Sequence, residues 1–142
     1  MSAVKLVAVF SQNKQGQLAR VTKTLADHGV NIRWVAIATT PSFGVIKLLA
    51  DPWTRALEAL KAEGRVVSLT EVLAVEVDDR PGGLHAVAEC LAQNGVNVEN
   101  ASGFVVGKRA VLLLELQDVS TGAAILARHG WRLFSAEETM TL

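Results

Sequence analysis

The chain has 142 residues, of which 50% are hydrophobic and 20% are charged, a composition that excludes an intrinsically disordered protein. Lysine and arginine together number 14, as do aspartate and glutamate, so the formal net charge is zero. A zero net charge excludes the basic footprint of nucleic-acid-binding proteins and the polybasic signal of proteins that bind membrane surfaces.

The first half of the chain predicts the order strand, helix, strand, strand, helix, strand. Short β-branched and apolar runs predict strands over residues 4–10, 30–38, 45–50 and 65–69. A helix is predicted between Gly16 and Gly29, because one stripe of residues recurs there at helical spacing. This stripe consists of Leu18, Val21, Thr22 and Leu25. A second helix is predicted over residues 54–63, and turn residues at 41–44 make the second and third strands a hairpin.

The second half predicts the same order of elements. Its strands are predicted over residues 72–77, 96–105, 110–116 and 131–135. Its first helix is predicted between Gly82 and Gly95, and its second over residues 121–129. The stripe of the first helix consists of Leu84, Val87, Ala88 and Leu91.

The two halves repeat one another in sequence. A shift of 66 residues aligns residues 12–32 with residues 78–98 without gaps, and 8 of these 21 pairs are identical. We therefore expect a duplication with two domains, residues 1–69 and 70–142. The order βαββαβ predicts an α+β, ferredoxin-like fold in each, with an antiparallel sheet and both helices on one sheet face.

The predicted strands are apolar on both sides. In the first strand, Val7 and Val9 point one way, and Leu6 and Ala8 point the other. The sheet face without helices therefore needs a cover, which the other half or a second subunit could supply. Residues 68–71, which join the halves, contain neither glycine nor proline, so we expect the halves to dock rigidly.

Signals of catalysis or metal binding are weak. His28, His85 and His129 fall near predicted helix ends, where His28 and His129 suit the helix dipole, and no two of them have metal-ligand spacing. Cys90 is the single cysteine, so no intrachain disulfide can form, and we interpret it as a half-buried structural thiol. No nucleophile or phosphate-binding motif occurs. We therefore expect no catalytic residue, no metal and no cofactor.

Other classes of partner are also disfavoured. RNA-binding modules of the same element order stack bases on aromatic residues of their first and third strands. Only Phe10 is aromatic in the corresponding predicted strands, so we expect no nucleic-acid partner. The longest apolar runs have about five residues, whereas a membrane span needs about 20. With no signal peptide evident, we expect a cytoplasmic protein. Trp34, Trp53 and Trp131 are interpreted as packing or interface residues.

The loop at residues 78–84 is the most informative segment. It leads directly into a predicted helix N-terminus, where free backbone N–H groups favour an anion. Gly82 and Gly83 would let a ligand approach the backbone closely. A small zwitterion fits this chemistry, with its carboxylate on these N–H groups and its ammonium on oxygens of Asn97 or Asp79. The same residues are also explained by a plain turn and helix cap, and local features leave both readings open.

The residues at 79–84 and 94–98 resemble the signature of the ACT domain, and those at 13–18 and 28–32 repeat it. Together with the segments at 42–47 and 70–75, the whole chain resembles stand-alone bacterial proteins with two ACT domains. ACT domains are ferredoxin-like modules that commonly bind amino acids and regulate metabolic enzymes. They pair edge to edge and hold ligands at the interface between two modules.

The resemblance implies ligand contacts from the loop before the first helix and from the asparagine that opens the second strand. In the first half these residues are Ser11, Asn13, Gly16 and Asn31. In the second half they are Val77, Asp79, Gly82 and Asn97, and the adjacent loop residues Gln17, Arg80 and Gly83 complete the candidate set. Gln17 stands where the second half has Gly83, and Val77 offers no polar side chain. We therefore predict two unequal sites.

The resemblance implies a non-catalytic regulatory protein that binds an amino acid, forms a homodimer and acts on a metabolic enzyme that is a separate chain. Its action would be linkage, because a ligand stabilises one arrangement of paired domains that a partner recognises. The alternative is a structural dimerisation module that has lost ligand binding, which the imperfect loop of the first half favours. A small enzyme is the third possibility.

Overall fold

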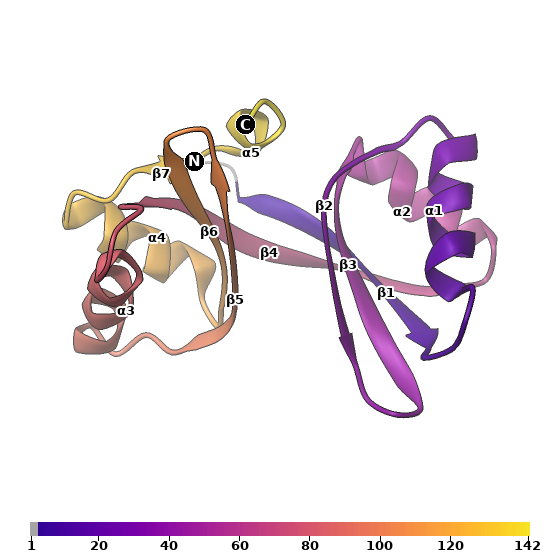
Figure 1. Ribbon diagram of the computed structural model, residues 1–142, viewed down its shortest axis with the longest axis horizontal. Helices are drawn as coiled ribbons and strands as arrows, with labels where there is room; N and C mark the ends of the chain where they lie inside the picture. Colours follow the sequence, from indigo (N-terminus) through magenta and orange to yellow (C-terminus); the bar gives the residue numbers. More distant parts are fainter. Residues whose placement is uncertain (1–2) are drawn as a thin grey trace. The chain divides into compact units, whose positions relative to one another are not determined.

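The computed structural model describes residues 3–142 and divides the chain into two compact units. The N-terminal module comprises Lys5–Thr70, and the C-terminal module comprises Glu71–Leu142 together with Val4. Each module has a β-sheet with helices along one face (Figure 1). In the part of the chain that the structure describes, none of the helices combines the length and the apolar character needed to cross a bilayer.

The N-terminal module begins with a strand, a helix and a β-hairpin. Its elements are β1 (Val4–Gln12), α1 (Gln17–Asp27), β2 (Asn31–Thr39), β3 (Phe43–Asp51) and α2 (Trp53–Ala62). Strand β3 lies between β1 and β2 and is antiparallel to both. The predicted helices and the predicted hairpin are thus confirmed. The core of this module forms where Val21 and Leu25 of α1 and Leu60 of α2 pack on the sheet.

The C-terminal module repeats this arrangement. Its elements are β4 (Val66–Val77), α3 (Gly83–Gln93), β5 (Val98–Val106), β6 (Arg109–Leu116), α4 (Val119–Arg128), β7 (Leu133–Phe134) and α5 (Ala136–Thr139). Residues 66–70 of β4 belong to the N-terminal module. Strand β6 lies between β4 and β5, and β7 pairs with β4, all antiparallel. This order is that of a ferredoxin-like sheet, which confirms the predicted fold class.

Two predictions at the ends of the modules are wrong. The separate strands predicted over residues 65–69 and 72–77 are one strand, β4, because nothing between them breaks an extended backbone. The final strand predicted over residues 131–135 is only two residues long and is followed by a short helix, α5, that was not predicted. Ser135 and Glu138 begin this helix with a capping box, each side chain bonding the other's backbone N–H.

Burial follows the predicted stripes only in part, since Thr22 is half-buried and Ala88 is exposed. Val21 and Leu25 in α1, and Val87 and Leu91 in α3, are buried. Leu18 and Leu84 belong to the same stripes but are 40% and 58% exposed, so they are not part of the cores. On the helix-free sheet faces, buried residues also occur, among them Leu6, Ala8, Ala74 and Leu113.

Candidate ligand-binding site

A groove occurs at the same place in both modules, between the loop that precedes the first helix and the ends of the hairpin strands. The N-terminal groove is lined by Ser11, Gln12, Asn13, Lys14, Gln17, Leu18, Ile37, Thr39, Gly44 and Ile46. The C-terminal groove is lined by Val77, Asp78, Asp79, Arg80, Pro81, Leu84, Gly103, Phe104, Val105, Ala110, Val111 and Leu112. Nine positions of the first set recur 66 residues later in the second, from Ser11 and Val77 to Ile46 and Leu112. The duplication has therefore produced two versions of one groove.

The N-terminal groove is small, and its polar side chains bond to the module itself. Its volume is about 90 Å³. The hydroxyl of Ser11 donates to Oε1 of Gln17 over 3.4 Å, and Nδ2 of Asn13 donates to the carbonyl of Thr40 over 2.9 Å. The structure thus brings the candidate residues Ser11, Asn13 and Gln17 together, whereas Gly16 does not line the groove.

The C-terminal groove is larger and carries charge at its rim. Its volume is about 550 Å³. Nη2 of Arg80 lies 3.0 Å from Oδ2 of Asp78, so these two residues pair with each other. The exposed carboxylate of Asp79 has no hydrogen-bond or ion-pair partner within residues 3–142. Of the candidate residues in this module, Val77, Asp79 and Arg80 line the groove, whereas Gly82 does not.

The helices that begin beside the grooves have uncapped N-termini. The N-cap residues Gly16 and Gly82 have φ angles of +87° and +89°, and among the described residues no side chain caps either helix. The N–H group of Gln17 already donates to the carbonyl of Lys14 over 3.4 Å, and that of Gly83 to the carbonyl of Arg80 over 3.0 Å. The remaining first-turn N–H groups of an uncapped helix are the ones that can bind an anion. By contrast, α4 is capped by the side chain of Asp118, which accepts a hydrogen bond from the backbone N–H of Thr121 over 3.0 Å.

The two loop glycines of the C-terminal module have different structural roles. A Cβ atom on Gly82 would meet no other heavy atom within 4 Å among the described residues, so this backbone is open to approach. Gly83 is buried, and the space beside its Cα is occupied by the carbonyl group of Asp78. Gly83 therefore serves the close packing of the loop on α3 and leaves no opening for a ligand.

The candidate asparagines lie far from the grooves of their own modules. Asn31 pairs with Asp51 at one end of the sheet, and Thr39 pairs with Gly44 at the other end, beside Ser11. Thr39 lies eight positions after Asn31 along β2, which is about 26 Å of extended chain. In the C-terminal module, Asn97 likewise precedes the end of β5 that lies opposite the groove. Neither module by itself brings its asparagine to its loop.

A second cavity lies in the C-terminal module behind the loop that follows β4. Its volume is about 480 Å³, and it is lined by Glu76, Val77, Asp78, Asp79, Lys108, His129, Gly130, Trp131 and Arg132. Several of its charges already interact, because Glu76 lies 3.7 Å from Arg132 and 3.8 Å from Arg109. Trp131 is half-buried and packs partly against the core, as expected for a packing residue.

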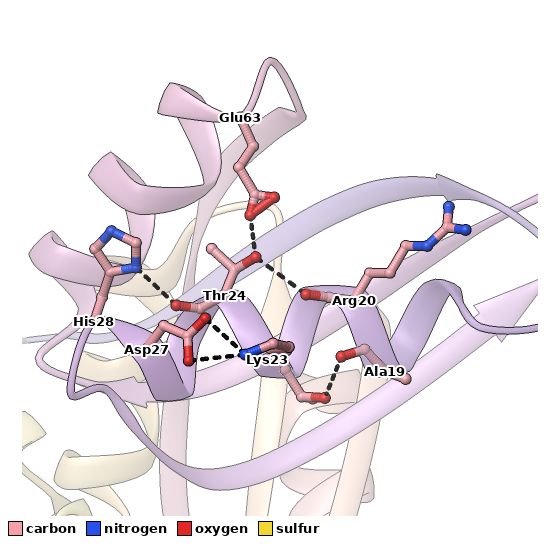
Figure 2. Close-up of polar contacts among 8 residues, drawn as sticks. Ala19, Arg20, Lys23, Thr24, Asp27, His28 and Glu63 are labelled. Carbon is pink, nitrogen blue, oxygen red and sulfur yellow. Dashed lines mark hydrogen bonds and ion pairs between the residues drawn. The ribbon is translucent and has the colours of Figure 1, made fainter.

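The histidines lie on helices, two of them at helix ends. Nδ1 of His28, at the C-cap of α1, donates to the carbonyl of Thr24 over 2.8 Å (Figure 2), and Nδ1 of His129 at the C-cap of α4 does the same to Ile125. His85 lies in α3, 3.3 Å from Glu89. Within the described part of the chain, no group of three potential metal ligands occurs.

Several groove residues are not in the candidate set from the sequence. Gln12, Lys14 and Thr39 are polar, and Leu18, Leu84, Ile37, Gly103 and Val105 are apolar or lack a side chain. The exposure of the two leucines could have been suspected from the sequence. Each lies in the first turn of its helix, before the residues that pack on the sheet. The strand residues gave no signal, because their neighbours across the groove come from distant elements.

Comparison with known proteins identifies relatives over nearly the whole chain. The family described as "ACT domain pair" matches residues 1–141. The solved structure of protein BT0572 from Bacteroides thetaiotaomicron has 26% sequence identity and a TM-score of 0.93, with 99% of this chain and 97% of that chain covered. A search of curated proteins finds no match.

Two further structures share the fold at lower identity. The ligand-free regulatory subunit of aspartate kinase from Thermus thermophilus has 18% identity and a TM-score of 0.63, with 92% of this chain and 94% of that chain covered. Aspartokinase III of E. coli, solved in complex with lysine and aspartate, has 16% identity and a TM-score of 0.50. That match covers 90% of this chain but 31% of the enzyme.

Proposed function

This chain belongs to the ACT domain pair family, and from that premise we propose that it is a non-catalytic regulatory protein that binds an amino acid at its grooves. The observation that carries this proposal is the recurrence of one groove at equivalent positions in both modules. In each case the groove lies beside an uncapped helix N-terminus.

The chemistry of the C-terminal groove suits the two charges of an amino acid. The ligand carboxylate would accept hydrogen bonds from the first-turn N–H groups of α3 that follow Gly83, where the helix dipole also favours negative charge. The ligand ammonium would pair with the free carboxylate of Asp79. Arg80 is held by Asp78 and so leaves Asp79 as the acidic group at the rim that is open to a cation.

The solved relatives support a regulatory role. One is a regulatory subunit of aspartate kinase, and another is an aspartokinase crystallised with lysine and aspartate. In this chain the regulated enzyme would be a separate protein, which recognises the arrangement that the ligand stabilises. Because Asn31 and Asn97 lie far from the loops of their own modules, we propose that a complete site uses the loop of one module and the asparagine of another, in a homodimer.

A thermal-shift screen of the full chain against the twenty amino acids tests this function. A ligand present at about 100 times its Kd adds about 2.7 kcal/mol of stability, which for a chain of this size raises Tm by several degrees. We expect a small set of amino acids to give this shift and isothermal titration calorimetry to confirm binding. If every amino acid leaves Tm unchanged and gives no binding heat, the proposed function is wrong.

The alternative is a dimerisation module without a ligand, and the N-terminal groove favours it. There, Ser11 bonds to Gln17 and Asn13 bonds to Thr40, so the polar groups are already satisfied. Size-exclusion chromatography with light scattering measures whether the chain is a dimer. Together with the thermal-shift screen, it distinguishes an amino-acid-binding protein from a dimerisation module. A dimer that responds to no amino acid supports the alternative.

A further inference from the structure

We propose that the C-terminal groove selects amino acids with an apolar side chain of several carbons, and that Gly103 creates the space that Ile37 fills in the N-terminal groove. This inference rests on the proposed binding of amino acids. It goes further by assigning the ligand class, the module that holds the ligand and the residue that makes the C-terminal groove larger than the N-terminal groove.

The strand register shows how one residue changes the groove. Ile37 pairs with Ile46, and Gly103 pairs with Leu112 at the equivalent place. Cross-strand partners project to the same face of a sheet, so the Ile37 side chain stands in the groove where Gly103 has none. On the opposite wall, Gln17 projects into the N-terminal groove and bonds to Ser11.

The volumes of the two grooves agree with the presence of Ile37 in one and Gly103 in the other. The C-terminal groove measures about 550 Å³ and the N-terminal one about 90 Å³. Sites for small molecules have volumes of about 300–1,000 Å³. Only the C-terminal groove falls in that range, so it is the one that can admit a bulky side chain.

The walls of the C-terminal groove are apolar and exposed to water. Leu84 and Val105 are 58% and 57% exposed, although both are large apolar residues. A ligand side chain placed between them would remove apolar surface from water on both partners, which favours binding by about 25 cal/mol per Å². In the N-terminal groove, the position of Val105 is taken by the polar residue Thr39.

The charge at the rim fixes the orientation of the ligand. Asp79 has a free carboxylate, whereas the equivalent Asn13 is uncharged and donates its amide hydrogen to Thr40. An ammonium group held at Asp79 leaves the ligand side chain directed toward the apolar wall. The carboxylate of Asp79 thus holds the ammonium end of the ligand, and the apolar wall selects the ligand's side chain.

Calorimetric titration with alanine, 2-aminobutyrate and norvaline tests the inference on the full chain. These ligands share the same charged groups and differ by one methylene at each step. Because a buried methylene is worth about 0.8 kcal/mol, we expect the affinity to rise up to about fourfold per step.

Substitutions at equivalent positions provide matched controls. Gly103→Ile gives the C-terminal groove the residue of the N-terminal one and should abolish the rise in affinity along the series. Its side chain requires Cδ2 of Leu112 to move, since a Cβ atom on Gly103 would lie 2.8 Å from it. Val105→Ser avoids this contact and should flatten the rise, while Thr39→Ser at the matching N-terminal position should leave it unchanged.

The possible outcomes separate the inference from the function it rests on. Equal affinity for all three ligands would overturn the inference but retain amino-acid binding. A rise that survives Val105→Ser and is lost in Thr39→Ser would also overturn it, by placing the ligand in the other groove. If none of the amino acids binds the unmodified chain, the proposed function fails, and the inference fails with it.

Discussion

The carbonyl oxygen of Asp78 lies where a Cβ atom on Gly83 would have to be. The loop after β4 therefore packs against the start of α3 more closely than any other residue type would allow. At the equivalent position of the N-terminal module, Gln17 carries a full side chain. The two loops consequently cannot have the same backbone path, and the duplicated modules differ at the point where a ligand is proposed to bind.

We expect Gly83→Ala to destabilise the protein by about 1–3 kcal/mol, the usual penalty for forcing an extra methyl group into a packed site. The clash is with backbone, which cannot rotate away as a side chain can. Urea denaturation measures the change in the free energy of unfolding. Gln17→Ala is the matched control and should change it by less than about 0.5 kcal/mol. Equal stability of the two variants would contradict this account of the loop.

Leu25→Ala and Leu91→Ala remove equivalent, fully buried side chains from the cores of the two modules. Each should lower the free energy of unfolding by about 2–5 kcal/mol, through lost burial and the cavity that remains. Leu84→Ala is the control in the same helix as Leu91, because Leu84 is largely exposed, and its effect should stay near 0.5 kcal/mol. A large loss for Leu84→Ala would show that this residue supports the core.

Asp79→Asn should weaken amino-acid binding by about tenfold or more, since a hydrogen bond to a charged group is worth about 1.5–3 kcal/mol. The substitution keeps the size of the side chain and removes its charge. Because Asp79 is exposed and has no partner within the described residues, the free energy of unfolding should not change. Calorimetry on both proteins provides the comparison, and an unaltered Kd would exclude Asp79 from the site.

Asn31→Ala or Asn97→Ala should weaken binding even though each asparagine lies about 26 Å along the strand from the loop of its own module. The reason is that the proposed site is completed by a different module. Affinity is measured for both variants with the amino acid found in the screen. Unchanged affinity in both variants would mean that one module holds the ligand alone.

Asp118 links the stability of α4 to pH. The backbone N–H of Thr121 donates to its carboxylate and holds the pKa of Asp118 below its ordinary value. A carboxyl group with a lowered pKa in the folded state contributes stability above its unfolded pKa, and this contribution is lost as the pH falls through the folded pKa. We therefore expect the stability that Asp118 contributes at neutral pH to disappear in the acid range, below about pH 4.

Asp118→Asn separates this titration from the capping role. Asparagine also caps helices but does not ionise in this range. In the variant, the free energy of unfolding should depend less on pH between neutral and acid conditions than in the unmodified protein. Parallel pH profiles for the two proteins would contradict the assignment.

The order of elements could be predicted from the sequence because it follows from local patterns. A helical stripe such as Val21 and Leu25, followed by Gly29 with its φ of +68°, marks a helix and its end without knowledge of distant residues. The same patterns did not show that residues 65–69 and 72–77 form one continuous strand, because that depends on distant residues. Residues 68–71 allow an extended backbone as readily as a turn, and only the pairing partners of β4 decide between them.

The duplication, the βαββαβ order of each half and the difference in charge between the loops before α1 and α3 can all be read from local sequence patterns. Which of the loop residues lie together depends on how distant elements pack. Periodicity identifies the residues that share a face of a helix, but it does not show how far the sheet covers that face. The exposure of Leu84 therefore could not be predicted from its place in the stripe. Likewise, the antiparallel register sends Asn97 to the far end of the sheet and brings Gly103 opposite the loop, because the groove is formed by residues distant in sequence.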